Sequence, residues 1–369
     1  MIGRERILNL LRGRTVEGMA WNALVDFSTL TAMPPEVQAL TVVEFCRLVG
    51  SDVVQLGDFG LPPDCQVGDP YQAVTPGVDV EETTAPDGTL VRQTVTPWGV
   101  LEATFRQGHP LKHPVNNLEE LRILKKMWLS TRYEEAGEDW ETRYRRADEY
   151  IGESGIYTHF IPSSPVQRLL QYEMGLENFY YLLLDFRSEM EELLGIMQVR
   201  WLESVSILAR RTPAQIIIPV ENTSTTLISP ALYARYSLPQ IRAFVELVHA
   251  RGKKAVLHMC GWLKNLLPCL QETNLDGIHA LTPPTVGDTP FELAMDSLGE
   301  RVTLMGVLDG TVFHDPQATH RDIWALLDRV YTPRLRTSNF LLIVAADGLP
   351  TPLWKFQAVQ EWMSRKGGR

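Results

Sequence analysis

A histidine and a cysteine two residues apart, His258 and Cys260, are the side chains of this sequence best suited to chemistry. They follow a short apolar run, 255–257, which is entered from a Gly-Lys-Lys turn and indicates a buried strand. Because side chains alternate along a strand, the two residues point the same way. Zinc accepts imidazole nitrogen and thiolate sulfur, so the pair predicts half of a zinc site. The alternative is a packed histidine beside a small hydrophobic cysteine.

Two further ionisable residues stand at the ends of neighbouring apolar runs. Glu221 follows the run 216–220 (IIIPV), where a carboxylate serves as a metal ligand or a general acid/base, or else as a helix cap or ion-pair partner. His279 lies in the run 277–281 (GIHAL), where it either completes a His/Cys/His metal set or is a satisfied core histidine. Both therefore enter the predicted metal site beside His258 and Cys260.

The elements that position these residues alternate between strand and helix. Strands are predicted at 155–161, 214–220, 254–260, 276–281, 302–307 and 340–345, after earlier strands that end near Asp26 and at 51–60. Helices are predicted at 3–14, 35–49, 118–128, 138–150, 164–210, 230–251, 263–272, 291–298, 320–331 and 353–365. Seven or eight repeats with short connections favour a closed (β/α)8 TIM barrel over an open sheet.

One stretch in the N-terminal half departs from this rhythm. Residues 65–108 alternate in polarity and carry an Asp87-Gly88 turn and a Thr/Val-rich run, which predicts an antiparallel β insertion. No dinucleotide or P-loop fingerprint, internal repeat or linker is found in the sequence. The prediction is therefore one α/β barrel domain over residues 1–369 with a β-rich insertion at about 65–108.

In a barrel, the residues just after each strand converge on one mouth. Polar side chains occupy these positions with a regularity that packing alone does not require. The set comprises Asn22, Asp26, Gln55, Asp58, His159, Glu221, Asn222, His258, Cys260, His279, Asp309 and Asp347. We expect Asn22, Asp26, Gln55, Tyr157, His159 and Asn222 to bind substrate.

Composition narrows the class of protein. The chain has 369 residues, 44% of them hydrophobic and 22% charged, which is globular composition, and its net charge of −10 makes binding of nucleic acid unexpected. No apolar run approaches the roughly 20 residues of a membrane span, and the N-terminus lacks the pattern of a signal peptide. The four cysteines have no disulfide-like spacing, so a cytoplasmic protein is expected, and homodimer formation stays open.

The sequence resembles the uroporphyrinogen decarboxylase superfamily, most strongly over about 214–350. The resemblance rests on four short motifs and on the prolines that follow two of them. These are Leu227-Ile228-Ser229-Pro230 with Leu238-Pro239, His258-Met259-Cys260-Gly261 with Pro268, Asp276-Gly277-Ile278 leading to Leu281-Thr282-Pro283, and Gly306-Val307-Leu308-Asp309. The superfamily has a (β/α)8 barrel, in agreement with the alternation of elements.

The resemblance favours one branch of that superfamily. True decarboxylases carry an arginine-rich motif that grips the carboxylates of a tetrapyrrole, whereas residues 19–26 (MAWNALVD) contain no arginine. The sequence is closer to the cobamide-dependent methyltransferases, whose zinc is held by His-x-Cys and a later cysteine. His258 and Cys260 match the first two ligands, but Ala346 stands where the third is expected. His279, Glu221 or Asp347 would then complete the site.

The resemblance implies a zinc-dependent methyltransferase. Zinc would activate a substrate thiol or ether, and the methyl group would move to or from a corrinoid carried by a partner protein. Asp58, Asp309, Asp347 and Glu221 are the candidates for orienting the substrate or moving a proton. Two alternatives are a metal-free decarboxylase or lyase, in which the aspartates and Tyr157 act on a smaller substrate, and a non-catalytic binding protein.

Overall fold

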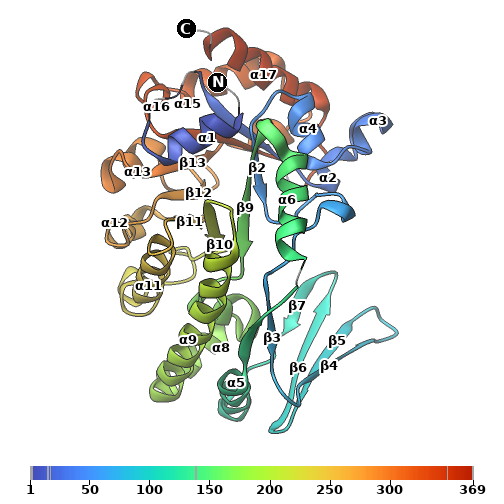
Figure 1. The fold of residues 1–369 in the computed structure, drawn as a ribbon, viewed down its shortest axis with the longest axis vertical. Helices are drawn as coiled ribbons and strands as arrows, with labels where there is room; N and C mark the ends of the chain where they lie inside the picture. Colours follow the sequence, from blue (N-terminus) through green and yellow to red (C-terminus); the bar gives the residue numbers. More distant parts are fainter. Residues whose placement is uncertain (1–2, 15, 17, 138, 347, 368–369) are drawn as a thin grey trace.

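A computed structural model describes residues 3–14, 16, 18–137, 139–346 and 348–367. In these residues eight parallel strands form a nearly closed barrel, in the order β1-β14-β13-β12-β11-β10-β9-β2, and the predicted (β/α)8 fold is confirmed (Figure 1). The strands are β1 (Ala20–Leu24), β2 (Val53–Leu56), β9 (Gly155–Ile161), β10 (Ile216–Pro219), β11 (Lys254–His258), β12 (Gly277–Leu281), β13 (Thr303–Val307) and β14 (Phe340–Ala345).

Helices and helical turns connect the strands and surround the barrel. In chain order they are α2 (Phe27–Leu30), α3 (Pro35–Gln38), α4 (Val42–Leu48), α5 (Leu118–Ser130), α6 (Trp140–Ile151), α7 (Pro165–Arg168), α8 (Gly175–Asp185), α9 (Arg187–Arg211), α10 (Pro230–Leu232), α11 (Leu238–His249), α12 (Leu267–Gln271), α13 (Phe291–Leu298), α14 (Thr311–His314), α15 (His320–Val330), α16 (Pro333–Arg336) and α17 (Leu353–Gly367). No helix in the described ranges is long and apolar enough to cross a membrane.

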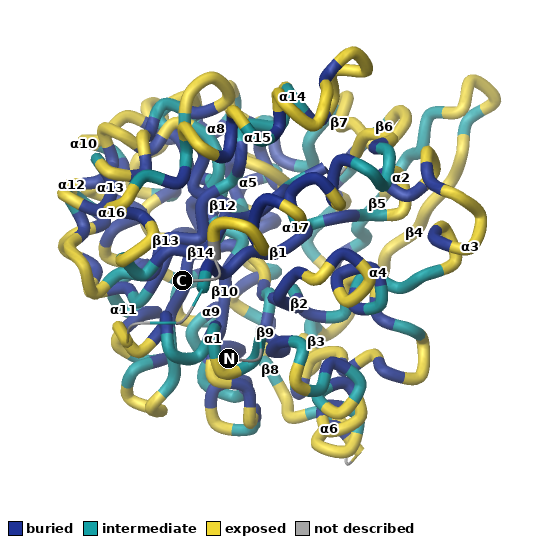
Figure 2. The backbone as a smooth tube through the Cα atoms, turned by 90° about the horizontal axis from the view of Figure 1, so that it is seen from above, coloured by how far each residue is buried: buried dark blue, intermediate teal, exposed yellow. Residues whose placement is uncertain are grey.

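The interior of the barrel is filled by aliphatic side chains that alternate along the strands. Ile216 and Ile218 of β10 meet Val256, Met305 and Ile343 in this cluster, while the intervening residues pack outward against the helices. Figure 2 shows these strands as the buried centre of the molecule. Parallel strands covered on both sides read as continuous apolar runs, and for this reason their positions could be predicted.

The first helix, α1 (Gly3–Leu11), covers the amino end of the barrel. Its Ile7, Leu10 and Leu11 are buried in the same cluster as the inward-facing strand residues. The backbone oxygen of Leu10 accepts a hydrogen bond of 3.2 Å from Thr303, the first residue of β13. Because α1 fills that end, the carboxyl end of the barrel is the one left for a site.

The strands at the two ends of the sheet order, β1 and β2, are not paired by a ladder of strand hydrogen bonds, and single hydrogen bonds close the seam between them. The backbone N–H of Asp52 donates to the oxygen of Trp21 at 2.8 Å, and the Asn22 side-chain amide donates to the oxygen of Asp52 at 2.9 Å. Asn22 is only 3% exposed. The structure thus places this predicted substrate-binding residue in the wall of the barrel, with its amide N–H used across the seam.

The predicted antiparallel insertion is present and extends somewhat further than expected. Strands β4 (Asp79–Thr84), β5 (Leu90–Thr96), β6 (Gly99–Arg106) and β7 (His109–Lys112) form one sheet, and β3 (Tyr71–Val74) pairs with β8 (Arg132–Glu135) after α5. In Figure 1 these strands lie beside α5, at the opposite end of the molecule from α17. Figure 2 shows β4 as largely exposed.

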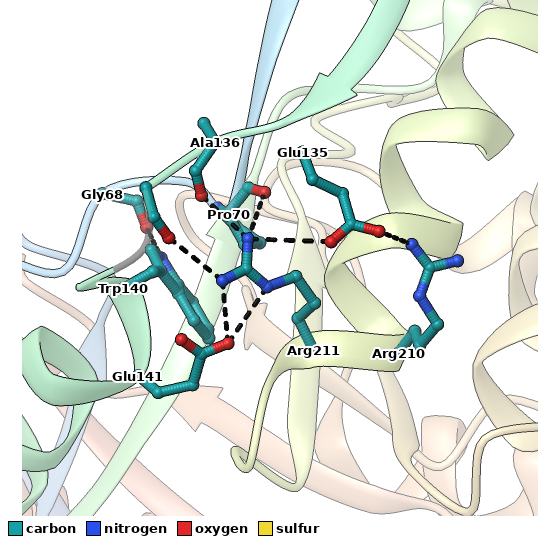
Figure 3. Close-up of polar contacts among 9 residues, drawn as sticks. Gly68, Pro70, Glu135, Ala136, Trp140, Glu141, Arg210 and Arg211 are labelled. Carbon is teal, nitrogen blue, oxygen red and sulfur yellow. Dashed lines mark hydrogen bonds and ion pairs between the residues drawn. The ribbon is translucent and has the colours of Figure 1, made fainter.

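Arg211, the last residue of α9, forms hydrogen bonds with the segments that flank β3 and β8 at the base of this insertion (Figure 3). Its side chain is only 14% exposed and forms hydrogen bonds with three backbone oxygens and one carboxylate. These partners are Pro70 at 3.3 Å, Ala136 at 2.8 Å, Gly137 at 3.1 Å and Glu141 at 2.8 and 3.1 Å. The rigid fork of a guanidinium is suited to such a set of acceptors.

We expect Arg211→Gln to lower the free energy of unfolding by about 2 kcal/mol, because three backbone carbonyl groups lose charge-assisted hydrogen bonds. Urea denaturation followed by circular dichroism measures the change. Arg210→Gln is the matched control, since Arg210 is 47% exposed and pairs with the carboxylate of Glu135. The control substitution should lower the free energy of unfolding by less than about 0.5 kcal/mol. Equal losses in the two variants would contradict the role assigned to Arg211.

Candidate site at the carboxyl end of the barrel

His258 and His279 form a contacting pair inside the barrel. They are register partners, His258 as the last residue of β11 and His279 as the middle residue of β12, and their rings stack with centroids 5.0 Å apart. The two Nδ1 atoms are 2.8 Å apart, so one ring donates a hydrogen bond to the other. His258 is partly buried, whereas His279 is fully buried beneath it. The strand alternation that places both side chains inward therefore makes a histidine dyad.

Burial keeps both rings of the dyad neutral. It lowers the pKa of His258 to about 4 and, together with the neighbouring His258, holds the pKa of His279 well below its ordinary value. A neutral ring carries one N–H, so in the tautomer in which His258 donates through Nδ1, its Nε2 retains a lone pair. The Nε2 of His279 is buried without a hydrogen-bond partner among the described residues.

Cys260 and Asn222 complete the polar group at this place. Cys260 lies two residues after the end of β11, and its Sγ is 3.2 Å from the side-chain oxygen of Asn222. Val220 forms a bridge with His258, which brings the end of β10 alongside β11. The structure thus brings together two contacting pairs from the predicted set, His258 with His279 and Cys260 with Asn222.

Glu221 is turned away from this group. It is fully buried, and its carboxylate accepts hydrogen bonds from the Ser164 hydroxyl at 2.9 Å, the Ser164 N–H at 3.2 Å and Thr223 at 2.7 Å. Burial raises the pKa of Glu221, and these three donors oppose the rise. Glu221 therefore holds the loops after β9 and β10 together. Ser164 and Thr223 were not anticipated, because a serine and a threonine in loops carry no distinctive sequence signal.

Asp58 and Tyr157 meet one another away from the histidine dyad. The carboxylate of Asp58 accepts hydrogen bonds from the Tyr157 hydroxyl at 3.0 Å and from the backbone N–H groups of Val67 and Gly68 at 2.8 and 2.7 Å. Burial and then the charge of Asp58 raise the pKa of Tyr157. The pair fixes the loop that follows β2.

His159 and Gln55 also pack outside the barrel interior. His159 Nε2 is 2.6 Å from the Thr212 hydroxyl, the ring stacks on Trp140, and burial lowers its pKa to about 3. The amide of Gln55 donates to the oxygens of Gly57 and Phe59 in its own loop. These two predicted substrate-binding residues lie on the outward faces of β9 and β2.

The aspartates after β1 and β13 serve as local caps. Asp26 accepts a hydrogen bond from Thr29 N–H at 2.8 Å in a capping box, and Gly348 N–H donates to its other oxygen. Asp309 accepts from Thr311 N–H at 3.0 Å. The predicted catalytic residue Asp347 lies outside the described residues.

His258 and Cys260 are residue types that bind zinc, but they supply only two of the ligands that a zinc ion needs. His258 offers a neutral imidazole whose other nitrogen is held by His279, and Cys260 offers sulfur next to it. No group of three His, Cys, Asp or Glu side chains suited to a metal occurs within the described ranges. His279 lies behind His258, where it orients the ring, and Glu221 is engaged elsewhere.

Comparisons with known proteins agree with this architecture. Residues 166–334 match the family model of uroporphyrinogen decarboxylase (URO-D). No curated protein matches the chain.

Two solved structures resemble this chain to different degrees. A methyltransferase from Methanosarcina mazei aligns over 99% of both chains with a TM-score of 0.59 and 14% sequence identity, which shows a shared fold. A D-psicose 3-epimerase, solved in the presence of D-fructose, aligns over 67% of this chain and 87% of its own at 10% identity, with a TM-score of only 0.37. The matched segment contains the His258-Met259-Cys260 motif and the dyad, so this part of the chain is similar to the uroporphyrinogen decarboxylase family.

Proposed function

We propose that this protein is a zinc-dependent methyltransferase that moves a methyl group between a corrinoid and a small molecule. The observation that carries the proposal is the placement of His258 and Cys260 together at the carboxyl end of β11, beside Asn222. Barrels of this class place their active sites at that end. The fold shared with a methanogen methyltransferase supports the same class of activity.

In this proposal His258 and Cys260 hold the metal, and His279 positions the His258 ring through the Nδ1 contact. Zinc bound there would act as a Lewis acid that lowers the pKa of a substrate thiol or polarises an ether oxygen. Asn222, whose oxygen contacts Cys260, orients the sulfur. The neutral state of both imidazoles avoids the cost of displacing protons from the ligand ring.

The corrinoid would be carried by a separate protein that docks over the barrel mouth. Partly buried apolar side chains, including Leu24, Leu56, Phe160 and Val307, form the floor of that mouth in the same cluster as the barrel interior. An apolar floor beside a small polar group is typical of small-molecule sites.

A metal-free carboxy-lyase is the second candidate. It is favoured by one observation, which is that no group of three His, Cys, Asp or Glu side chains suited to a metal occurs among the described residues. In that case His258 and Asn222 would bind substrate directly, with the neutral dyad exchanging a proton.

Elemental analysis of protein purified without added metal separates the two candidates. We expect close to one zinc per chain in the wild type and less than about a tenth of that in the His258→Ala/Cys260→Ala variant, because both proposed ligands are lost. Methyl transfer from methylcobalamin to small thiols is expected to disappear in the same variant.

Cys269→Ala is the matched control. Cys269 is another partly buried cysteine, but it lies on α12 and has no place in the site. This variant should keep its zinc and its methyl transfer. A wild-type protein that takes up no zinc even when zinc is supplied would exclude the zinc mechanism and leave the carboxy-lyase as the better explanation.

A further inference from the structure

A cavity of about 590 Å³ lies between the antiparallel insertion and the carboxyl end of the barrel. One wall comes from β4, β5 and β6, and the other from the chain that follows β9 and β10. Its size is within the range of sites for small organic ligands. Val220, which lines the cavity, is the bridge partner of His258, so the cavity adjoins the proposed site.

Most of the lining is apolar. The sheet and the neighbouring α5 contribute aliphatic, aromatic and thioether side chains, and the barrel contributes a proline and a valine. The residues that matter here are Val78, Leu101, Phe105, Met127, Pro162 and Val220. Such a surface favours a ligand with a hydrocarbon or aromatic body.

Two arginines from separate elements face the same cavity. Arg92 of β5 bonds Glu82 through Nε at 2.6 Å and lies 5.2 Å from the Phe105 ring centroid. Arg168 of α7 bonds Glu173 through Nε at 2.8 Å. Within the described residues, the terminal nitrogens of both guanidinium groups have no hydrogen-bond partner. These are the atoms that bind a carboxylate in bidentate fashion.

Both guanidinium groups keep their terminal nitrogens available for an anion. Each is paired through Nε with one carboxylate, Glu82 or Glu173, and of these two only Glu173 lines the cavity. The side chains of Arg92 and Arg168 are 46% and 37% exposed, so neither has to be uncovered for a ligand to reach it. An apolar cavity with the terminal nitrogens of two guanidinium groups at its edge matches an amphipathic acid.

We propose that this cavity binds a small carboxylate with an aromatic or branched apolar body, and that its carboxylate is held by Arg92 and Arg168. The apolar body lies between the sheet and Val220, directed to the end of the barrel that carries His258. The inference rests on the proposed function where it makes this acid the substrate of the reaction. Binding itself depends on neither zinc nor a methyl donor.

The test is isothermal titration calorimetry of the full chain with 3-phenylpropanoate and with its uncharged analogue 3-phenylpropanamide. We expect the carboxylate to bind at least about tenfold more tightly than the amide, because only the carboxylate accepts the charged hydrogen bonds. In the Arg92→Gln/Arg168→Gln variant this preference should disappear. Arg122→Gln, which removes an exposed arginine of α5 that pairs with Glu189, should preserve it.

The same titration with the His258→Ala/Cys260→Ala variant separates the two proposals. A carboxylate preference that persists there supports the binding site even if no zinc or methyl transfer is found. Failure of both compounds to bind, equal affinity for both, or an unchanged preference in the double arginine variant would overturn the inference.

Discussion

Replacing Lys355 by methionine is expected to lower the free energy of unfolding by about 4 kcal/mol, since three backbone carbonyls lose a charged donor. Lys355 lies on α17 with only 1% of its surface exposed. Its Nζ donates to the backbone oxygens of Val312, Phe313 and Asp315 at 3.1, 2.6 and 2.6 Å. These carbonyls end α14, the helix that follows β13. Methionine keeps the length of the side chain and removes only the donors.

Urea denaturation measures this effect, and Lys366→Met is its control. Lys366 stands on the same helix, is 46% exposed and pairs with Asp328 at 3.4 Å. A surface ion pair of this kind contributes less than about 1 kcal/mol. If the two lysine variants were equally stable, the three carbonyl contacts of Lys355 would make no net contribution to the free energy of unfolding.

The second large effect concerns pH and Asp52. This residue is 6% exposed and faces Arg6, whose Nε lies 3.7 Å from its carboxylate. Burial raises the pKa of Asp52 from 3.8 to about 6, although Arg6 and a backbone hydrogen bond oppose the rise. Near pH 5 the folded protein therefore holds a proton that the unfolded chain has released.

The stabilisation from this proton is fully present below the unfolded pKa of 3.8 and is lost as the pH rises through about 6. We expect the stability of the wild type, relative to Asp52→Asn, to fall by about 2 kcal/mol between about pH 4 and pH 7. Urea midpoints at four pH values measure it. Asp79→Asn, at an exposed position of β4, is the control, and its urea midpoint should differ from that of the wild type by the same amount at all four pH values. The same pH-independent difference for Asp52→Asn would show that its carboxyl does not titrate in this range.

The barrel could be predicted from sequence because its strands are continuous apolar runs. The strands predicted at 155–161 and 340–345 agree with β9 and β14 at both ends. The run predicted at 254–260 ends at His258, since Gly261 follows with a positive φ and the chain turns. The long helical tract predicted at 164–210 is divided by a π-helical turn at Leu169–Glu173 and by breaks before α8 and α9. Helical periodicity alone does not reveal these breaks.

The site was harder to predict than the fold because both faces of each strand are buried. His258 and His279 face inward, whereas Tyr157 and His159 face outward, and the apolar neighbours of the two kinds look alike. Sequence gives the alternation of side chains but not which face is the inner one. The capping roles of Asp26 and Asp309 did carry a signal, since a threonine follows each at the spacing of a cap or turn.

The insertion and the barrel form the two walls of one cavity, and these walls differ in how far they are buried. One wall of the cavity of about 590 Å³ belongs to buried barrel elements, and the other belongs to a sheet whose strand β4 is exposed throughout. Substitutions in the exposed strand β4 meet few packing constraints, whereas those in the barrel disturb a filled interior. A change of ligand can thus accumulate in β4 while the histidine dyad and the strands around it stay as they are.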